Sequence, residues 1–306
     1  MNHSFATEFI IIGLTRNSLQ GVLFVIFLFL YLVAFLSNML IVVVIIYNNT
    51  LHTPMYVFLL ALAIVDIICT TNIIPKMLWT TLPSQKTTSY GGFISFFFFS
   101  WSLGAKMILF TTMAYNCYLA ICFLLHYSTI MNHQKCVALL SIVMTIAVTS
   151  SWVHTGLLLK LTFCGPDTTD HFFCELTPLL ALSCSSVRVN EVTSHITDIA
   201  LAIADFTLTF ISSSSIIVAI LQICTAERKK KAFSTCLSHF IVVSLYYLPV
   251  IYTCICPATS YTFDRRKGIA ALYTVVTPTL NPIVYSFWNE EMQVGIKKVF
   301  ASLKHL

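Results

Sequence analysis

Five ionisable residues stand inside long apolar runs of the sequence: Asp66, Lys76, Lys106, Asp198 and Asp205. A charged side chain is costly to place in hydrocarbon, so an ionisable residue at membrane depth indicates a functional role by default. Lys76 lies near the end of its run, where a flexible ammonium group can reach the membrane surface. The other four are candidates for chemistry inside the membrane.

Asp198 and Asp205 are seven residues apart in one run, and this spacing places both on one face of a helix. If that face lines a pocket, Asp198 can receive the amine or hydroxyl group of a ligand. The alternative is a protonated carboxyl group that bonds to a neighbouring helix. We expect this second state for Asp205, which lies deeper.

The composition requires a membrane around these residues. Of the 306 residues, 58% are hydrophobic and only 9% are charged, whereas soluble domains carry roughly a quarter of charged residues. This composition excludes a water-soluble globular protein. It also excludes a disordered chain, which combines low hydrophobicity with high charge.

Seven apolar runs reach the length of about 20 residues that a membrane helix needs. They cover residues 22–47, 56–80, 91–121, 137–160, 192–223, 232–256 and 269–287. The runs are apolar on every side, whereas the strands of a membrane barrel alternate. We therefore predict an all-α bundle of seven transmembrane helices, formed as a single domain over residues 1–306.

Two features indicate the orientation of the bundle. The basic block Arg228–Lys231 favours the cytoplasmic side for its loop. The loop that contains Cys164, Cys174 and Cys184 favours an oxidising compartment on the opposite side. Both place the amino terminus outside the cell, where Asn2 begins an Asn-His-Ser glycosylation pattern.

Four segments share their residues with one protein family. They read Leu-His-Thr-Pro-Met-Tyr at 51–56, Met-Ala-Tyr-Asn-Cys-Tyr-Leu-Ala-Ile-Cys at 113–122, Lys-Ala-Phe-Ser-Thr-Cys at 231–236 and Pro-Thr-Leu-Asn-Pro-Ile-Val-Tyr at 278–285. In this order they resemble an olfactory receptor, a branch of the rhodopsin-like G-protein-coupled receptors. The resemblance implies a plasma-membrane receptor for small volatile odorants that couples to a heterotrimeric stimulatory G protein and raises cyclic AMP.

The resemblance places the odorant pocket among the third, fifth, sixth and seventh spans. From their helix positions the candidate lining residues are Phe99, Ser100, Leu103, Asp198, Ala202, Tyr247, Ile251 and Tyr273. An aromatic and aliphatic lining suits a small apolar ligand. No enzyme motif, metal site, cofactor or nucleic-acid partner is indicated. A membrane transporter is the alternative from a different class.

Lys106 departs from the family. The family resembled here holds an aspartate at the position of Asp66 and usually an acidic residue at the position of Lys106, and the wider class binds sodium at such a site. Two carboxylates require a cation, whereas Asp66 and Lys106 can neutralise each other. We therefore predict a buried charge pair in which the ammonium group replaces the ion.

The seventh span contains Asn281 and Pro282, followed by Tyr285. Pro282 interrupts the hydrogen bonds of the helix and kinks it. The resemblance implies a hinge that moves on activation; a static kink is the alternative. Residues 289–304 follow as a predicted amphipathic helix on the membrane lipids, with basic residues beside its apolar face.

The third span ends in Asn116-Cys117-Tyr118, where the family has Asp-Arg-Tyr. The family's arginine meets the G protein, and Cys117 has no positive charge. The family also usually has a proline at the position of Leu124 and an arginine at the position of Trp288. Single transitions between C and T or G and A account for these two changes and for those at Lys106, Asn116 and Cys117. The pattern favours a receptor that has drifted away from efficient signalling; a specialised receptor that activates through other contacts is the alternative.

The resemblance also implies a disulfide bond between Cys164 and Cys184. In the family, the middle loop cysteine bonds to the outer end of the third span. The sequence has no cysteine between Cys69 and Cys117, so Cys174 lacks its usual partner.

Overall fold

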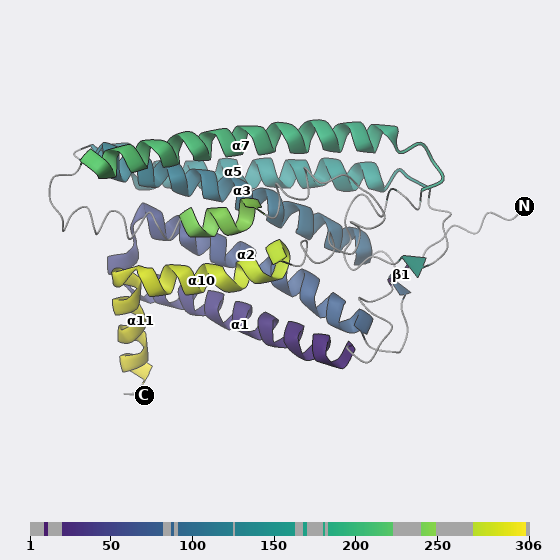
Figure 1. The fold of residues 1–306 in the computed structure, drawn as a ribbon, viewed down its shortest axis with the longest axis horizontal. Coiled ribbons are helices and arrows are strands. Elements are labelled where there is room, and N and C mark those ends of the chain that lie inside the picture. The colour runs from purple at the N-terminus through teal and green to yellow at the C-terminus, as the bar shows by residue number, and fades with distance from the viewer. Residues whose placement is uncertain are drawn as a thin grey trace, which may run out of the picture.

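The computed structural model describes residues 9–11, 20–81, 87–88, 91–124, 126–162, 168–169, 180, 183–222, 240–248 and 272–303. Within these ranges, five helices are long and apolar enough to cross a membrane. They are α1 (Gln20–Tyr47), α2 (Pro54–Thr81), α3 (Gly91–Cys122), α5 (His133–Leu158) and α7 (Arg188–Gln222). The predicted helical membrane bundle is confirmed (Figure 1).

The predicted sixth and seventh spans are described in part. Residues 240–248 form a helical segment of the sixth span. The seventh span begins with a π-helical turn, η2 (Leu272–Val276), and continues as α10 (Thr277–Trp288). Pro282 lies inside α10, as the sequence indicates.

Shorter elements connect and close the bundle. They are the 3₁₀ turn η1 (Asn49–Leu51), the helices α4 (Tyr127–Ile130) and α11 (Glu290–Leu303), and the strands β1 (Phe9–Ile11), β2 (Thr87–Thr88) and β3 (Thr168–Thr169). β1 pairs antiparallel with β2 and parallel with β3. This small sheet lies at the end of the bundle opposite α11 (Figure 1). The strands are too short to change the fold class.

The spanning helices α5 and α7 each begin four residues before the predicted apolar runs 137–160 and 192–223. The side chain of Asn132 caps α5 by accepting a hydrogen bond of 2.9 Å from the backbone N–H of Lys135, which satisfies one of the free donors at a helix start. Residue Glu191 lies in the first turn of α7, where a negative charge suits the positive end of the helix dipole. Polar first turns extend these helices beyond the hydrocarbon, so apolar runs alone underestimate them.

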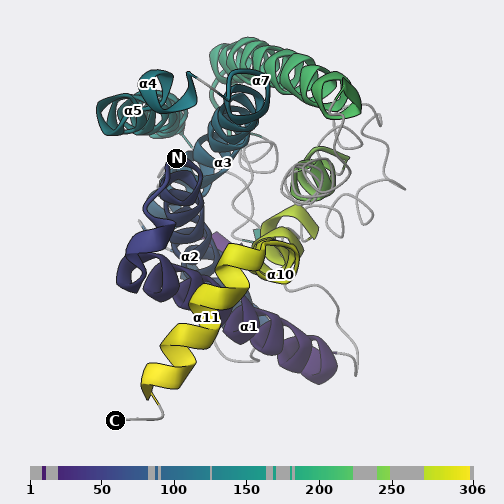
Figure 2. The same ribbon diagram turned by 90° about the vertical axis from the view of Figure 1, so that its left-hand side faces the viewer.

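α3 is the central helix, because it packs against α2, α5 and α7. Figure 2 shows the bundle from one end, with α3 between α2 and α7 and with α5 beside it. Much of the outer surface is apolar, and large side chains such as Phe29 and Phe210 are exposed. Lipid is the solvent for such a surface, while backbone groups are satisfied inside the helices. The polar groups at the centre of the bundle are therefore the ones that need an explanation.

Candidate functional site

A fully buried polar contact joins Asp66 of α2 to Lys106 of α3. The Lys106 Nζ atom lies 2.8 Å from Asp66 Oδ1, and both side chains are fully buried. The structure thus brings together the two residues that the sequence predicts as a charge pair. A buried ion pair is costly to desolvate, and it is stable only when its remaining polar atoms are also bonded.

Asn281 of α10 provides such a bond. Its Nδ2 atom donates to Asp66 Oδ2 over 2.8 Å, so each oxygen of Asp66 has its own partner. The Asn281 side chain is also buried. Lys106, Asp66 and Asn281 therefore form a polar triad that joins α3, α2 and α10, and the proposed hinge residue is part of it. The sequence predicted the pair but not its connection to Asn281.

Asn38 of α1 makes a second link to the seventh span. Its Nδ2 atom donates to the carbonyl oxygens of Pro278 (2.9 Å) and Ala34 (2.8 Å). Proline at position 282 cannot donate to the carbonyl four residues before it, and that carbonyl belongs to Pro278. Asn38 therefore satisfies the group that the proline leaves free. Sequence reasoning missed this residue, although an asparagine inside an apolar run was a usable signal.

Tyr285 follows the proline and points into the bundle. Its side chain is buried, and its hydroxyl group has no hydrogen-bond partner among the described residues. The structure thus places Asn281, Pro282 and Tyr285 on one short helix whose polar groups face the core.

Three of the predicted pocket residues, Phe99, Leu103 and Tyr247, pack in the interior of the bundle. Phe99 is buried in a cluster with Cys69, Ile74 and Val275, and Leu103 packs against the same cluster. Tyr247 is buried on the helical segment 240–248, where its ring meets Phe206 edge-on at 6.3 Å between centroids. Neighbouring Tyr246 donates to the backbone carbonyl of Leu103 over 3.4 Å, which joins this segment to α3.

The remaining predicted pocket residues are less fully described. Ser100 and Ala202 are half-buried. The backbone of Tyr273 lies in η2, and Ile251 lies outside the described residues.

The two aspartates of α7 occupy different environments. The Asp198 side chain is 64% exposed, and its Oδ1 atom lies 3.4 Å from His154 Nε2 of α5. Asp205 is only 6% exposed and faces α3, where Thr111 donates to its Oδ1 atom. The helix face that the sequence assigns to both therefore changes its neighbour along its length.

The end of α3 carries the altered coupling segment. Asn116 is buried, and its Oδ1 atom accepts a 2.9 Å hydrogen bond from the hydroxyl of Tyr127 in α4. Burial is the main cause that raises the pKa of Tyr127 to about 12, so the hydroxyl keeps its proton at neutral pH. This bond holds α4 against α3 without a charge on residue 116.

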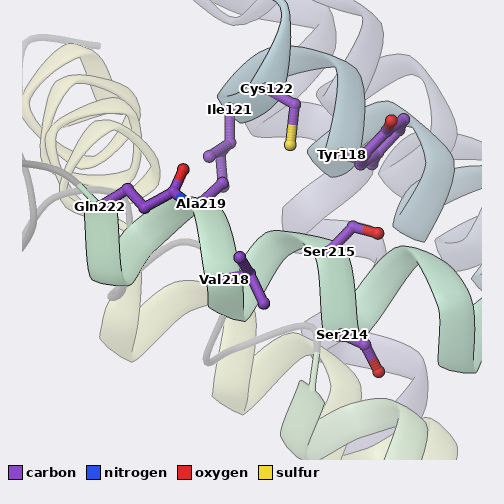
Figure 3. A pocket seen from close by; sticks show the side chains of 8 residues that line it. All are labelled: Tyr118, Ile121, Cys122, Ser214, Ser215, Val218, Ala219 and Gln222. Carbon is purple, nitrogen blue, oxygen red and sulfur yellow. The ribbon is translucent and has the colours of Figure 1, made fainter.

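Cys117 is 6% exposed and packs in an apolar cluster with Ile216 and Ile220 of α7. No positive charge stands at this position. Beside the cluster, a groove of about 570 Å³ separates the ends of α3 and α7. Tyr118, Ile121, Cys122, Ser214, Ser215, Val218, Ala219 and Gln222 line this groove (Figure 3). None of the residues that line this groove carries a charged side chain.

α11 is anchored to the bundle by polar and apolar contacts. The hydroxyl of Tyr56 lies 2.9 Å from Asn289 Oδ1 and 3.0 Å from Glu291 Oε2. Asn289 also caps α11 by accepting from the N–H of Met292. A Cβ atom at Gly295 would lie 2.9 Å from Val44 Cγ1, so only glycine permits this approach.

The predicted apolar face of α11 is shared between the bundle and its surroundings. Met292 is fully buried, and Ile296 and Val299 pack against the core of the bundle. Phe300 is 52% exposed, and Lys297 and Lys298 are exposed as well. Part of the face predicted for lipid contact therefore binds the protein itself.

Four predicted residues belong to the disulfide and glycosylation predictions, and the structure describes one of them. Cys184 is disulfide-bonded, whereas Cys164, Cys174 and Asn2 lie outside the described residues. The pairing of Cys164 with Cys184 stays a prediction. Within the described part of the chain, no group of three or more His, Cys, Asp or Glu residues could hold a metal ion.

Comparison with known proteins gives one consistent result. The sequence profile of the family described as "Olfactory receptor" matches residues 27–303. Human olfactory receptor 13G1 is 70% identical over the full length of both chains. Human olfactory receptor 13A1 is 43% identical over 98% of this chain and 92% of its own length. Mouse olfactory receptor 5AR1 is 38% identical over 97% of each chain.

Proposed function

Because the chain belongs to the olfactory receptor family, we propose that it binds a small volatile odorant inside the bundle and couples to a stimulatory G protein that raises cyclic AMP. Membership of this receptor family makes the chain a membrane protein and not an enzyme. It also argues against the transporter alternative. Coupling to the stimulatory G protein and the odorant itself belong to the proposal.

The main support is the continuity of α3. This one helix of 32 residues carries the candidate pocket residues Phe99 and Leu103 near one end and Asn116 and Cys117 near the other. It also carries Lys106 of the polar triad between them. A change in the pocket can therefore reach the G-protein side through a single rigid element and the triad that it shares with α2 and α10. The hinge at Asn281 and Pro282 would give the seventh span its freedom to respond.

The receptor is expected in the plasma membrane with its amino terminus outside. In this orientation the ends of α3 and α7 that form the groove face the cytoplasm. The exposed Lys297 and Lys298 of α11 then lie beside the inner leaflet, where basic side chains suit anionic lipid headgroups.

The test is a ligand screen with cyclic AMP as the readout, in cells where surface expression is measured separately. A ligand-dependent rise in cyclic AMP supports the proposal. Surface-expressed receptor that binds odorants without a cyclic AMP response would remove the coupling step and leave the binding step.

A second candidate function is a receptor that binds odorants but signals poorly. The observation behind it is Cys117, which packs against Ile216 and Ile220 and carries no charge. Restoring the family residues by Asn116→Asp and Cys117→Arg should then raise the cyclic AMP response several-fold. A strong ligand-dependent response in the native chain would overturn this candidate in favour of a specialised receptor.

For the triad, the function that fits best is a permanently attached cation. Lys106 places its ammonium group 2.8 Å from Asp66 Oδ1, which is where a receptor with two acidic residues would hold a metal cation. The charge cannot dissociate, because it is part of the chain. The receptor should therefore be insensitive to sodium.

A further inference from the structure

Among the described residues, Asp205 differs from Asp66 and Asp198 in its partners. Asp66 has Lys106 at 2.8 Å, and Asp198 has His154 at 3.4 Å. Asp205 has no cation within ion-pair distance among the described residues, although it is 94% buried. A carboxylate this far from water is strongly destabilised unless it binds a proton or pairs with a cation.

One oxygen of the Asp205 carboxyl group accepts a hydrogen bond, and the other has no hydrogen-bond partner among the described residues. Thr111 of α3 donates to Oδ1, and the Thr111 hydroxyl is itself 2.9 Å from that of Thr209, one turn further along α7. The second oxygen, Oδ2, is buried and has no hydrogen-bond partner among the described residues. The hydroxyl contacts hold the group through Oδ1 and leave Oδ2 without a donor among the described residues.

One residue predicted to line the odorant pocket is close to Asp205 on the same helix. Ala202, a candidate pocket residue, is three positions earlier, which is about one turn along α7. Phe206 follows Asp205 directly, and its ring meets the ring of Tyr247 edge-on. The Tyr247 hydroxyl is also buried and without a partner among the described residues. The residue next to Asp205 thus contacts the helical segment that carries this unpartnered phenol, and aromatic rings also attract cations.

We propose that Asp205 forms the anionic floor of the odorant pocket and selects ligands that carry a small aliphatic amine. This inference rests on the proposed odorant-binding function. An ammonium group supplies the donor that Oδ2 lacks and the positive charge that the site lacks. An alcohol supplies only the donor. If the carboxyl group holds a proton before binding, that proton moves from oxygen to the nitrogen of a neutral amine, and the ion pair forms without any other reactant.

Asp205 thereby takes the ligand-binding role that the sequence suggested for Asp198. There Asp198 is the candidate for an amine, and Asp205 is expected to bond only to a neighbouring helix. The hydrogen bond from Thr111 to Oδ1 agrees with that expectation. The expectation does not account for Oδ2, which has no partner among the described residues. Asp198, in contrast, is exposed and beside His154.

The experiment is thermal unfolding of the purified full-length receptor in detergent, followed by intrinsic tryptophan fluorescence, which does not require a G protein. Butylamine, hexylamine and octylamine are compared with butanol, hexanol and octanol at equal pH. We expect the preferred amine to bind about tenfold more tightly than the alcohol of equal length, because hydrogen bonds to charged groups are the stronger ones.

The variant Asp205→Asn should remove this preference. It keeps an oxygen that can accept from Thr111, so its fold should persist, and its unfolding midpoint without ligand checks this. Asp198→Asn is the matched control on the same helix and should keep the amine preference.

Equal binding of amines and alcohols, or an amine preference that survives in Asp205→Asn, would overturn the inference. If alcohols stabilise the receptor and amines do not, the inference fails while odorant binding stands. If none of the probes shifts the midpoint, the inference fails. The same experiment with a broader set of aldehydes, ketones and esters then tests odorant binding itself.

Discussion

Asp66 and Asp205 are the same residue type, both buried in one bundle, yet they differ in what surrounds them. Asp66 has a lysine on one oxygen and an asparagine on the other. Asp205 has a threonine on one oxygen and nothing described on the other. A buried carboxyl group in a membrane protein can therefore have one of two roles. A fully paired one joins helices, whereas an open one can recognise a ligand.

Lys106→Met should be the most destabilising substitution, because it leaves Asp66 buried without its cation. Removing one partner of a buried ion pair costs about 3–5 kcal/mol, so we expect poor surface expression and a large drop in the unfolding midpoint. The double variant Lys106→Met with Asp66→Asn should recover much of the loss, because no charge is left unpaired. If Lys106→Met is as stable as the native chain, the pair is not what joins α2 to α3.

The second test removes the other partner of Asp66. Asn281→Ala deletes the 2.8 Å hydrogen bond to Oδ2, and a hydrogen bond to a charged group contributes about 1.5–3 kcal/mol. We expect a loss of stability of that size in thermal or denaturant unfolding. The matched control is Asn190→Ala, since Asn190 is also buried but its Nδ2 has no partner among the described residues. Equal losses in the two variants would show that burial, and not the bond to Asp66, matters at position 281.

Replacing each aspartate by asparagine tests directly whether Asp66 and Asp205 differ in their contribution to stability. Asp205→Asn should change the free energy of unfolding by less than about 1 kcal/mol, because it removes an uncompensated carboxyl group and keeps an acceptor for Thr111. Asp66→Asn should cost about 3–5 kcal/mol, because it leaves Lys106 unpaired. Both are measured in the same unfolding assay. Similar costs for the two variants would contradict the distinction between a paired and an open carboxyl group.

The smallest expected effect is that of sodium. Replacing sodium by choline at constant ionic strength should leave the unfolding midpoint and the ligand response of the native receptor unchanged, because Lys106 already neutralises Asp66. Lys106→Glu would place two acidic side chains together, and sodium should then stabilise the variant. A clear sodium dependence of the native chain would exclude the role proposed for Lys106.

Much of the fold was predictable from the sequence because hydrocarbon imposes a simple requirement. Each span must hide its backbone in a helix and cover it with apolar side chains, so apolar runs such as residues 22–47 reveal α1 directly. The limits were less accurate where polar residues continue a helix into water, as at the capped start of α5. The helix predicted at 289–304 is present as α11. Its contacts with the bundle were not predicted, because they depend on Tyr56, far away in the sequence, and on the close approach at Gly295.

Part of the candidate site was also predictable from the sequence, and part was not. Opposite charges at Asp66 and Lys106 suggested a pair, because neither can remain alone in a membrane. The spacing of Asp198 and Asp205 indicated a shared face but not which helix lies opposite each one. That depends on the angle at which α7 crosses α3 and α5, and periodicity within a single helix contains no such information.

Composition and local periodicity were enough to show that this chain is a helical membrane protein and which residues carry charge into the lipid. The receptor family followed from the resemblance of four sequence segments and not from composition. Only the tertiary structure decided which of those charges are compensated. Compensation requires atoms from different helices to meet within about 3 Å, as Lys106 and Asn281 meet Asp66. The open oxygen of Asp205 is likewise a property of packing between helices.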